Sequence, residues 1–296
     1  MANQYTCEME NKVDITEGIP ETCASCGAKL KGEYCRKCGE KKIVPERDFS
    51  MAKFVTQTLG HAVHFDTKLG RSLWFLFVKP GFLTAEWIAG RRVRYMKPLQ
   101  LFVLAGILFY FFLPSVPAHF SHCRDLVRGF ETQNIVLNTF RYDAGQALTE
   151  MAGSGRIGMD DLTKEIDKAA GQRSKTWLFL IIPFWGALVY LFFRNKIPWL
   201  VPHFIFAVHG LILYILTDLL IHFFMAALGL PPIGKDMMLL LLLVFFPYLV
   251  LAARRVYGTS WAMTVVKVIG LEAGLLIFLI FYRQLMTIWT IVVHSS

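Results

Sequence analysis

Five long apolar runs in the C-terminal two-thirds of the chain constrain its fold more than any other feature. They span about residues 99–116, 177–193, 199–230, 237–253 and 261–282. A helix of about 20 residues crosses the ~30 Å apolar core of a bilayer, where every backbone polar group must be paired within the protein. The composition agrees, with 55% hydrophobic and 18% charged residues. We therefore predict an all-α polytopic membrane protein whose transmembrane bundle occupies residues 98–296 and has about five spans.

Four cysteines upstream of these runs form a metal-binding motif. Cys23 and Cys26 belong to one Cys-x-x-Cys-Gly knuckle, and Cys35 and Cys38 belong to a second, with eight residues between the pairs. Two such knuckles supply the four thiolates of a tetrahedral site, for which Zn²⁺ is the expected ion and rubredoxin-like iron the alternative. All four positions are filled by protein, so the ion would be structural. We predict a small Cys₄ zinc ribbon over residues 21–42.

The stretches on either side of the ribbon differ in character. Residues 1–20 have no apolar periodicity and predict a disordered leader. Residues 48–97 predict interfacial amphipathic helices that end in basic residues, because their apolar stretches are periodic or too short to span a bilayer. Pro80-Gly81 predicts a turn between two short helices there. Near the end of an earlier amphipathic helix, His61, His64 and Asp66 are either solvated capping groups or a metal or catalytic site.

Basic residues lead into the first apolar run. We call Arg91, Arg92, Arg94 and Lys97 the basic collar. Because residues 1–60 are neutral overall, the collar predicts contact with anionic lipid headgroups and no nucleic-acid partner. Lys and Arg near the ends of the runs follow the positive-inside pattern if the thiolates lie in the reducing cytoplasm. This predicts an inner-membrane protein with a cytoplasmic N-terminus, an extracytoplasmic C-terminus and an extracytoplasmic helical loop over residues 117–175.

Ionisable residues within two of the apolar runs form a candidate intramembrane polar site. Asp218 and His222 lie one helical turn apart, and Glu272 lies at the middle of the last run. Charged groups at such depth are costly unless they are paired or hydrated. The three residues therefore predict either a proton or cation pathway between two helices or a buried polar pair that sets the helix register.

Several segments outside the apolar runs carry a family resemblance. They are the two knuckles, Glu40-Lys-Lys, His64-Phe-Asp66, Lys79-Pro-Gly and Gly90-Arg-Arg-Val-Arg-Tyr-Met-Lys-Pro98. Together they resemble a family of bacterial membrane proteins catalogued as domain of unknown function 3667, over about residues 20–115. The resemblance implies a cytoplasmic zinc-ribbon head on a multi-pass inner-membrane bundle. It implies no activity.

These observations leave three functions open. The first is a non-enzymatic scaffold, regulatory or assembly protein that docks a cytoplasmic protein partner through the ribbon. The second is a proton- or cation-coupled transporter or channel that uses Asp218, His222 and Glu272. The third is a membrane-embedded enzyme acting on lipid near His61, His64 and the collar. The sequence contains none of the usual motifs of soluble enzymes.

Overall fold

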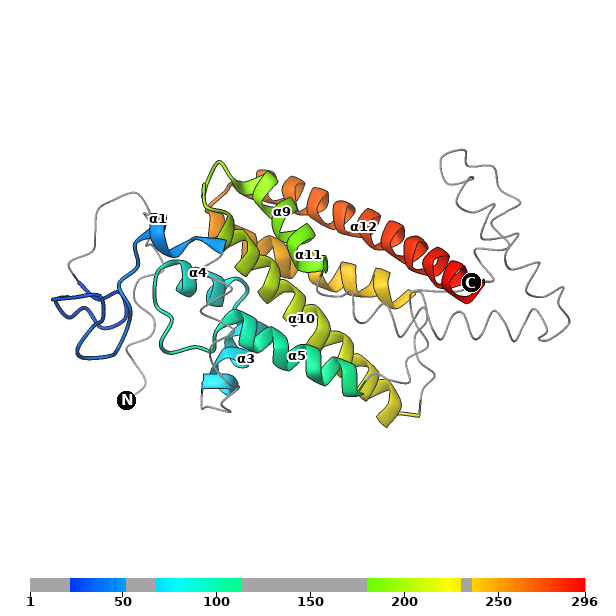
Figure 1. The fold of residues 1–296 in the computed structure, drawn as a ribbon, viewed down its shortest axis with the longest axis horizontal. Coiled ribbons are helices and arrows are strands. Elements are labelled where there is room, and N and C mark those ends of the chain that lie inside the picture. The colour runs from blue at the N-terminus through cyan, green and yellow to red at the C-terminus, as the bar shows by residue number, and fades with distance from the viewer. Residues whose placement is uncertain (1–21, 52–67, 113–179, 230–235, 296) are drawn as a thin grey trace, which may run out of the picture. The chain divides into compact units, whose positions relative to one another are not determined.

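The computed structural model describes residues 22–51, 68–112, 180–229 and 236–295, and this part of the chain is mostly helical (Figure 1). It contains no β-strands, only two isolated antiparallel bridges, Thr22 with Lys29 and Tyr34 with Lys41. The helices are α1 (Pro45–Asp48), α3 (Lys68–Val78), α4 (Phe82–Ile88), α5 (Pro98–Phe112), α9 (Ile181–Phe193), α10 (Leu200–Ala227), α11 (Asp236–Tyr257) and α12 (Trp261–Ser295).

Each of the five predicted apolar runs contains a helix, although the boundaries differ. Helix α11 continues past the expected end at residue 253 to Tyr257, and α12 continues to Ser295. By length and composition, two described helices could cross a membrane, namely α10 and the Trp261–Leu279 part of α12. The count of five transmembrane helices stays a prediction. The leader 1–20, the loop 117–175 and most of the first predicted amphipathic helix lie outside the described residues.

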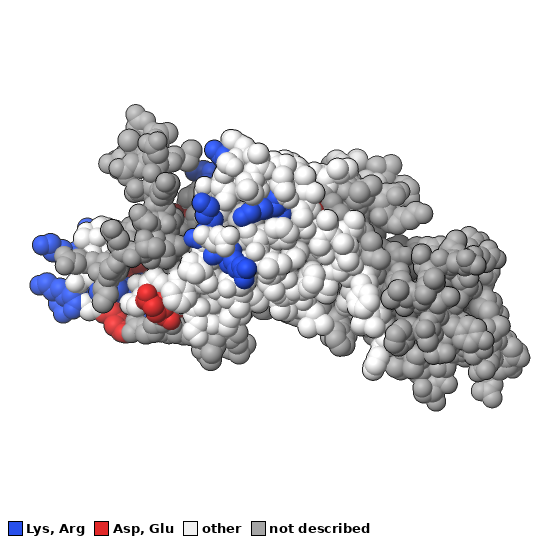
Figure 2. Space-filling model, turned by 90° about the horizontal axis from the view of Figure 1, so that it is seen from above, with Lys and Arg blue, Asp and Glu red and all other residues white. Residues whose placement is uncertain are grey.

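The chain divides into two compact units. The first comprises residues 1–107, 182–217 and 244–271, and the second comprises residues 108–181, 218–243 and 272–296. Every Lys and Arg whose side chain is described belongs to the first unit. On the face shown in Figure 2, these cations lie over the ribbon and the helix ends next to it. The described basic side chains are therefore confined to the first unit, while Arg283, whose side chain is not described, lies on α12 in the second unit.

Helices α3 and α4 form a hairpin around Gly81, as the Pro-Gly pair predicted. Gly81 has a φ of 71°, a left-handed conformation that favours glycine. A Cβ atom at this position would lie only 2.6 Å from the carbonyl oxygen of Ala252. The turn of the hairpin thus rests directly on the backbone of α11, and glycine is required there for two independent reasons.

Polar side chains attach the hairpin to the longer helices. The Tyr248 hydroxyl donates to the carbonyl of Leu76 at 2.6 Å, and Thr84 Oγ1 lies 2.9 Å from His209 Nδ1 in a fully buried pair. Arg255 Nη1 donates to the carbonyl of Pro80 at 2.6 Å. The first two contacts satisfy groups that burial would otherwise leave unpaired, which is a costly state in an apolar interior, whereas the Arg255 bond is exposed. The hairpin is consequently an integral part of the first unit.

A buried aromatic stack lies at the junction of α9, α10 and α11. His203 Nε2 lies 2.9 Å from the carbonyl of Ile197, which can only accept, so this nitrogen carries the proton. His203 Nδ1 then accepts from the Tyr257 hydroxyl at 3.0 Å. The Tyr257 ring also stacks on Phe193, with ring centroids 4.1 Å apart.

Lys267 donates to the carbonyl of Phe192 at 2.6 Å, so this cation binds a helix end within the protein.

Candidate functional site

The two Cys-x-x-Cys-Gly knuckles fold in the same way. In the first, Gly27 N–H donates to the carbonyl of Cys23 at 2.9 Å, and Cys23 N–H donates to the carbonyl of Ala28 at 2.8 Å. In the second, Gly39 and Cys35 make the corresponding bonds, the latter to the carbonyl of Glu40. Both glycines adopt positive φ angles of 70° and 74°. The glycine that follows each cysteine pair therefore allows the tight turn that directs both sulfurs to one point.

These turns bring the four thiols together. The Sγ atoms of Cys23, Cys26, Cys35 and Cys38 all lie within 4.8 Å of one another, and two of the pairs are 3.5 Å apart. Zn–S bonds of about 2.3 Å in a tetrahedron place neighbouring sulfurs roughly 3.8 Å apart. The donor set therefore fits a tetrahedral metal ion, and the predicted four-cysteine cluster is confirmed. The identity of the metal stays a prediction, since four thiolates also suit iron.

The backbone of the second knuckle favours thiolate formation. The N–H groups of Cys38 and Lys37 lower the pKa of Cys35 to about 7. A backbone bond from Glu40 has the same effect on Cys38, but burial and the three neighbouring thiols raise the pKa of Cys38 to about 12. Four crowded thiols cannot all carry negative charge without a counter-charge. A divalent cation would supply that counter-charge.

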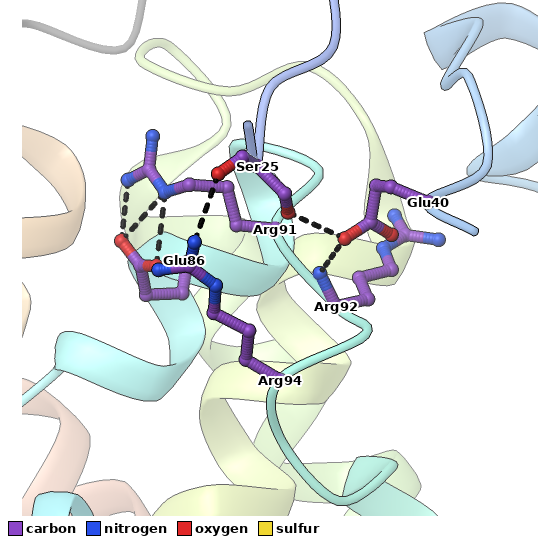
Figure 3. A network of polar contacts seen from close by, with 6 residues as sticks. All are labelled: Ser25, Glu40, Glu86, Arg91, Arg92 and Arg94. Atoms are coloured by element: carbon purple, nitrogen blue, oxygen red, sulfur yellow. Dashed lines mark hydrogen bonds and ion pairs between the residues drawn. The ribbon is translucent and has the colours of Figure 1, made fainter. Parts of the chain in front are cut away.

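A single carboxylate attaches the ribbon to the segment that precedes α5. Glu40, only 3% exposed, directs Oε2 at three donors. They are the Ser25 hydroxyl at 2.6 Å and the backbone N–H of Arg92 at 2.9 Å (Figure 3), together with the backbone N–H of Val93 at 3.0 Å. Ser25 lies inside the first knuckle, and Glu40 directly follows the second. The acceptor and one of its donors thus both depend on the turns that the metal ion would stabilise.

The arginines of the basic collar contact protein groups. Arg91 donates to the carboxylate of Glu86 on α4 and forms an ion pair with it (Figure 3). This hydrogen bond raises the pKa of Arg91, although partial burial lowers it. Arg94 donates to the carbonyl of Ser25 at 3.1 Å. The predicted contact of the collar with lipid headgroups stays a prediction. These contacts add a role that the sequence did not indicate, namely joining the ribbon to α4.

Arg92 is the most enclosed member of the collar. Its guanidinium carbon lies 3.4 Å from the centre of the Trp87 ring, and Nε donates to the Trp87 carbonyl at 3.1 Å. Burial lowers the pKa of Arg92 to about 9, against the opposing charges of Asp48 and Glu40. The group stays charged at neutral pH, so the stacked arrangement places a permanent cation beside the ribbon carboxylate.

Apolar contacts complete the attachment. Gly90 has a φ of 84°, and a Cβ atom there would lie 3.1 Å from Ile43 Cδ1 and 3.7 Å from Ala24 Cβ. Phe49 stacks on Trp87 with ring centroids 5.8 Å apart and meets the edge of Trp199. Phe49 belongs to a buried cluster with residues from α10. The segment from Ile43 to Phe49, which links the ribbon to the helices, therefore continues into the core of the first unit.

The linker itself is shaped by Asp48. Its carboxylate accepts from the N–H of Val44, the residue that precedes α1, at 2.9 Å. It also forms an ion pair with Lys41, with a nitrogen–oxygen distance of 3.3 Å. Both bonds hold the turn between the ribbon and Phe49.

The candidate intramembrane residues are placed in the second unit. Asp218 is 4% exposed, and its Oδ1 lies 3.4 Å from His222 Nδ1. The shorter bond of His222 is to the backbone carbonyl of Asp218, at 2.9 Å. Asp218 Oδ1 and Glu272 Oε1 are both buried and have no hydrogen-bond partner among the described residues. His61, His64 and Asp66 lie outside the described residues.

Sequence reasoning missed the residues that attach the ribbon. Glu40, Ser25 and Trp87 were not predicted as functional groups. One signal could have found Glu40: the two knuckles have the same spacing, and Glu40 occupies the position that Ala28 has in the first. An acidic residue at only one of two equivalent turn positions indicates a contact outside the repeat.

Comparison with known protein families gives a match to part of the chain. The chain matches a family described as "Protein of unknown function (DUF3667)" over residues 66–110, which contain α3, α4, the collar and most of α5. The matched residues do not include the ribbon. No curated protein and no solved structure matches the chain.

Proposed function

We propose that this protein is a non-enzymatic membrane scaffold that presents a metal-stabilised ribbon, in a fixed position, to a protein partner. The observation that carries the proposal is the Glu40 contact. A ribbon on a flexible tether would need no buried carboxylate directed at two backbone N–H groups of the collar. A four-cysteine site with no open position serves as a rigid structural unit, in agreement with a docking role.

The exposed surface of α12 supports a location in a membrane. This helix is apolar, and only 22% of its Trp261–Leu279 window is buried, so most of the window is exposed or half-buried among the described residues. Exposed large hydrophobic residues recur along it, at Trp261, Met263, Val266, Ile269, Ile277, Phe281, Leu285 and Trp289. A soluble protein rarely exposes so long an apolar surface. Lipid is the occupant that suits a helix of this length.

The position of the cations supports the orientation. All described Lys and Arg side chains lie in the unit that contains the ribbon. Cations near span ends favour the cytoplasmic side, and thiolates require a reducing compartment. We therefore propose a multi-pass inner-membrane protein with the ribbon in the cytoplasm and an extracytoplasmic C-terminus, in which Zn²⁺ is the structural ion.

The test compares partners of the whole protein with and without an intact ribbon. Wild type and a Cys35→Ser/Cys38→Ser variant would be crosslinked in cells, purified in detergent and analysed by quantitative mass spectrometry. A matched control is Ser50→Ala, which changes an exposed residue beyond the ribbon. A docking role requires at least one partner that is captured by wild type and control and lost with the cysteine variant. Identical partner profiles would refute it.

A second function is supported by two buried carboxylate oxygens that accept no hydrogen bond among the described residues, although Asp218 Oδ1 lies 3.4 Å from His222 Nδ1. Asp218 and Glu272 each bury one oxygen without a hydrogen-bond partner among the described residues, a state that is unfavourable for a carboxylate unless it binds a proton or a cation. A proton- or cation-coupled transporter or channel would use these groups together with His222. Reconstituted protein should then show a proton or cation flux that Asp218→Asn abolishes. An unchanged flux, or none in wild type, would exclude this function.

A further inference from the structure

The two knuckles of the ribbon are equivalent in structure but face different surroundings. A shift of twelve residues superimposes Cys23 on Cys35 and Ala28 on Glu40, and the backbone bonds repeat with it. The tip of the first knuckle is Ala24-Ser25, and the tip of the second is Arg36-Lys37. Because the turns are alike, each tip presents its two side chains in a similar way.

The first tip is already occupied. Ala24 packs near Gly90, and the carbonyl of Ser25 accepts from Arg94 while its hydroxyl donates to Glu40. These contacts attach the ribbon to the collar, and they bury Glu40. The first knuckle therefore shows that a tip of this geometry can dock on another surface through short polar contacts.

The second tip and its surroundings are exposed. Arg36 and Lys37 are both exposed, as are Lys29 and Lys31 in the loop between the knuckles. Tyr34 precedes the second knuckle and is 59% exposed, so it is one of the large hydrophobic side chains that the fold leaves at the surface. We call Lys29, Lys31, Tyr34, Arg36 and Lys37, which are exposed residues between the end of the first knuckle and the tip of the second, the outer face. In Figure 2, Lys side chains and Arg side chains project from the ribbon end of the first unit.

The charge of this face is set by the fold. Residues 1–60 are neutral in total, but residues 22–42 contain six Lys and Arg against Glu33 and Glu40. Glu40 is buried against the collar, so the folded ribbon shows one carboxylate, on Glu33, against four cations on the outer face. The attachment thus removes one of the ribbon's two acidic groups from the surface and makes the outer face strongly positive.

We infer that the outer face docks an acidic segment of a partner protein, with Tyr34 as the apolar anchor and the four cations pairing with Asp or Glu side chains. The inference rests on the proposed docking function and specifies its partner. Tyrosine and arginine are among the residue types enriched in the hot spots of protein–protein interfaces. A continuous phosphate backbone fits this face less well, because Glu33 lies between Lys31 and Tyr34.

The experiment gives the second knuckle the tip sequence of the first. The Arg36→Ala/Lys37→Ser variant gives both knuckles the tip Ala-Ser, which this chain already uses in a folded knuckle, so the turn and the metal site should be retained. The matched control is Arg194→Ala/Lys196→Ser, which removes the same charge from the exposed turn between α9 and α10. Zinc content is measured for each full-length, detergent-purified protein. Only variants with the wild-type metal content are compared.

Binding of a fluorescent oligo-glutamate peptide is then measured by anisotropy at low salt. Loss of two surface charge pairs should weaken binding about fivefold in the tip variant and less than about twofold in the control. Tyr34→Ala should weaken binding of a glutamate peptide that also contains leucine. Equal weakening in the tip variant and the control would overturn the inference, because the peptide would then sense only net charge.

Two parallel measurements test other occupants. The same proteins are titrated with a single-stranded oligonucleotide and with vesicles of phosphatidylglycerol and phosphatidylcholine. If the Arg36→Ala/Lys37→Ser substitutions weaken binding of either probe more than they weaken binding of the peptide, an acidic protein segment is refuted as the occupant. Crosslinking in cells separates this inference from the proposed function. Partners lost with the cysteine variant but retained with the tip variant would refute the inference alone.

Discussion

Replacing Glu40 with alanine should release the ribbon from the collar without unfolding it. Alanine occupies the equivalent position in the first knuckle, so the turn itself tolerates the change. The substitution removes one acceptor from the N–H groups of Arg92 and Val93 and from the Ser25 hydroxyl. Hydrogen bonds to a charged acceptor each contribute about 1.5–3 kcal/mol when buried. Because this carboxylate is buried but its donors are partly exposed, we expect a loss of about 2–4 kcal/mol in attachment free energy.

Hydrogen exchange measured by mass spectrometry would quantify this loss. A weakening of about 2–4 kcal/mol corresponds to roughly 30- to 1,000-fold faster exchange for amides protected only by the attachment. The affected amides should be those of residues 90–96, while the metal content stays at the wild-type value. Glu40→Gln keeps one acceptor oxygen and should show a smaller effect. Glu33→Ala, an exposed acid of the same ribbon, is the matched control. Unchanged exchange over residues 90–96 in Glu40→Ala would refute the role of the carboxylate.

Three further outcomes follow from the same structure. Removing the metal with a chelator should accelerate exchange over residues 90–96 as Glu40→Ala does, since both knuckle turns position the attachment; exchange confined to the ribbon would contradict this. Gly81→Ala should lower the thermal unfolding temperature, because its Cβ would lie 2.6 Å from the Ala252 carbonyl oxygen, whereas Gly70→Ala has no atom within 4 Å and should be neutral or stabilising. Thr84→Val and His209→Phe should be non-additive in a double-mutant cycle of unfolding free energy, with a coupling of about 1 kcal/mol; additive effects would show that their 2.9 Å contact is not a stabilising bond.

Local patterns in the sequence were sufficient for the elements and the metal ligands. The spacing of Cys23, Cys26, Cys35 and Cys38 predicts one cluster because two-residue spacers and the following glycines act within a single turn. The Pro80-Gly81 pair predicts the break between α3 and α4 for the same reason, since proline and glycine restrict or release φ at their own positions. Apolar runs likewise predict helices, because a backbone buried in an apolar environment must pair its own hydrogen-bonding groups.

Partner choice could not be predicted in this way. The cluster of Arg91, Arg92 and Arg94 before the first apolar run predicts contact with lipid headgroups. In the structure each of these arginines also contacts protein: Arg91 contacts Glu86, Arg92 stacks on Trp87 and Arg94 contacts the first knuckle. An arginine has the same donors for a phosphate and for a carbonyl, so its sequence context does not distinguish the two. Only the donor–acceptor distances in the tertiary structure show which acceptor each arginine contacts.

The sequence by itself therefore determined the helical, apolar character of the chain, the four-cysteine ligand set and the concentration of basic residues before the first apolar run. Only the tertiary structure decided that Glu40 faces inward to the collar and that the cations of the second knuckle face outward. The physical reason is the range of the interactions. Turn geometry and helix formation depend on neighbours a few residues apart. The hydrogen bond from Arg92 N–H to Glu40, in contrast, joins residues that are 52 positions apart in the sequence.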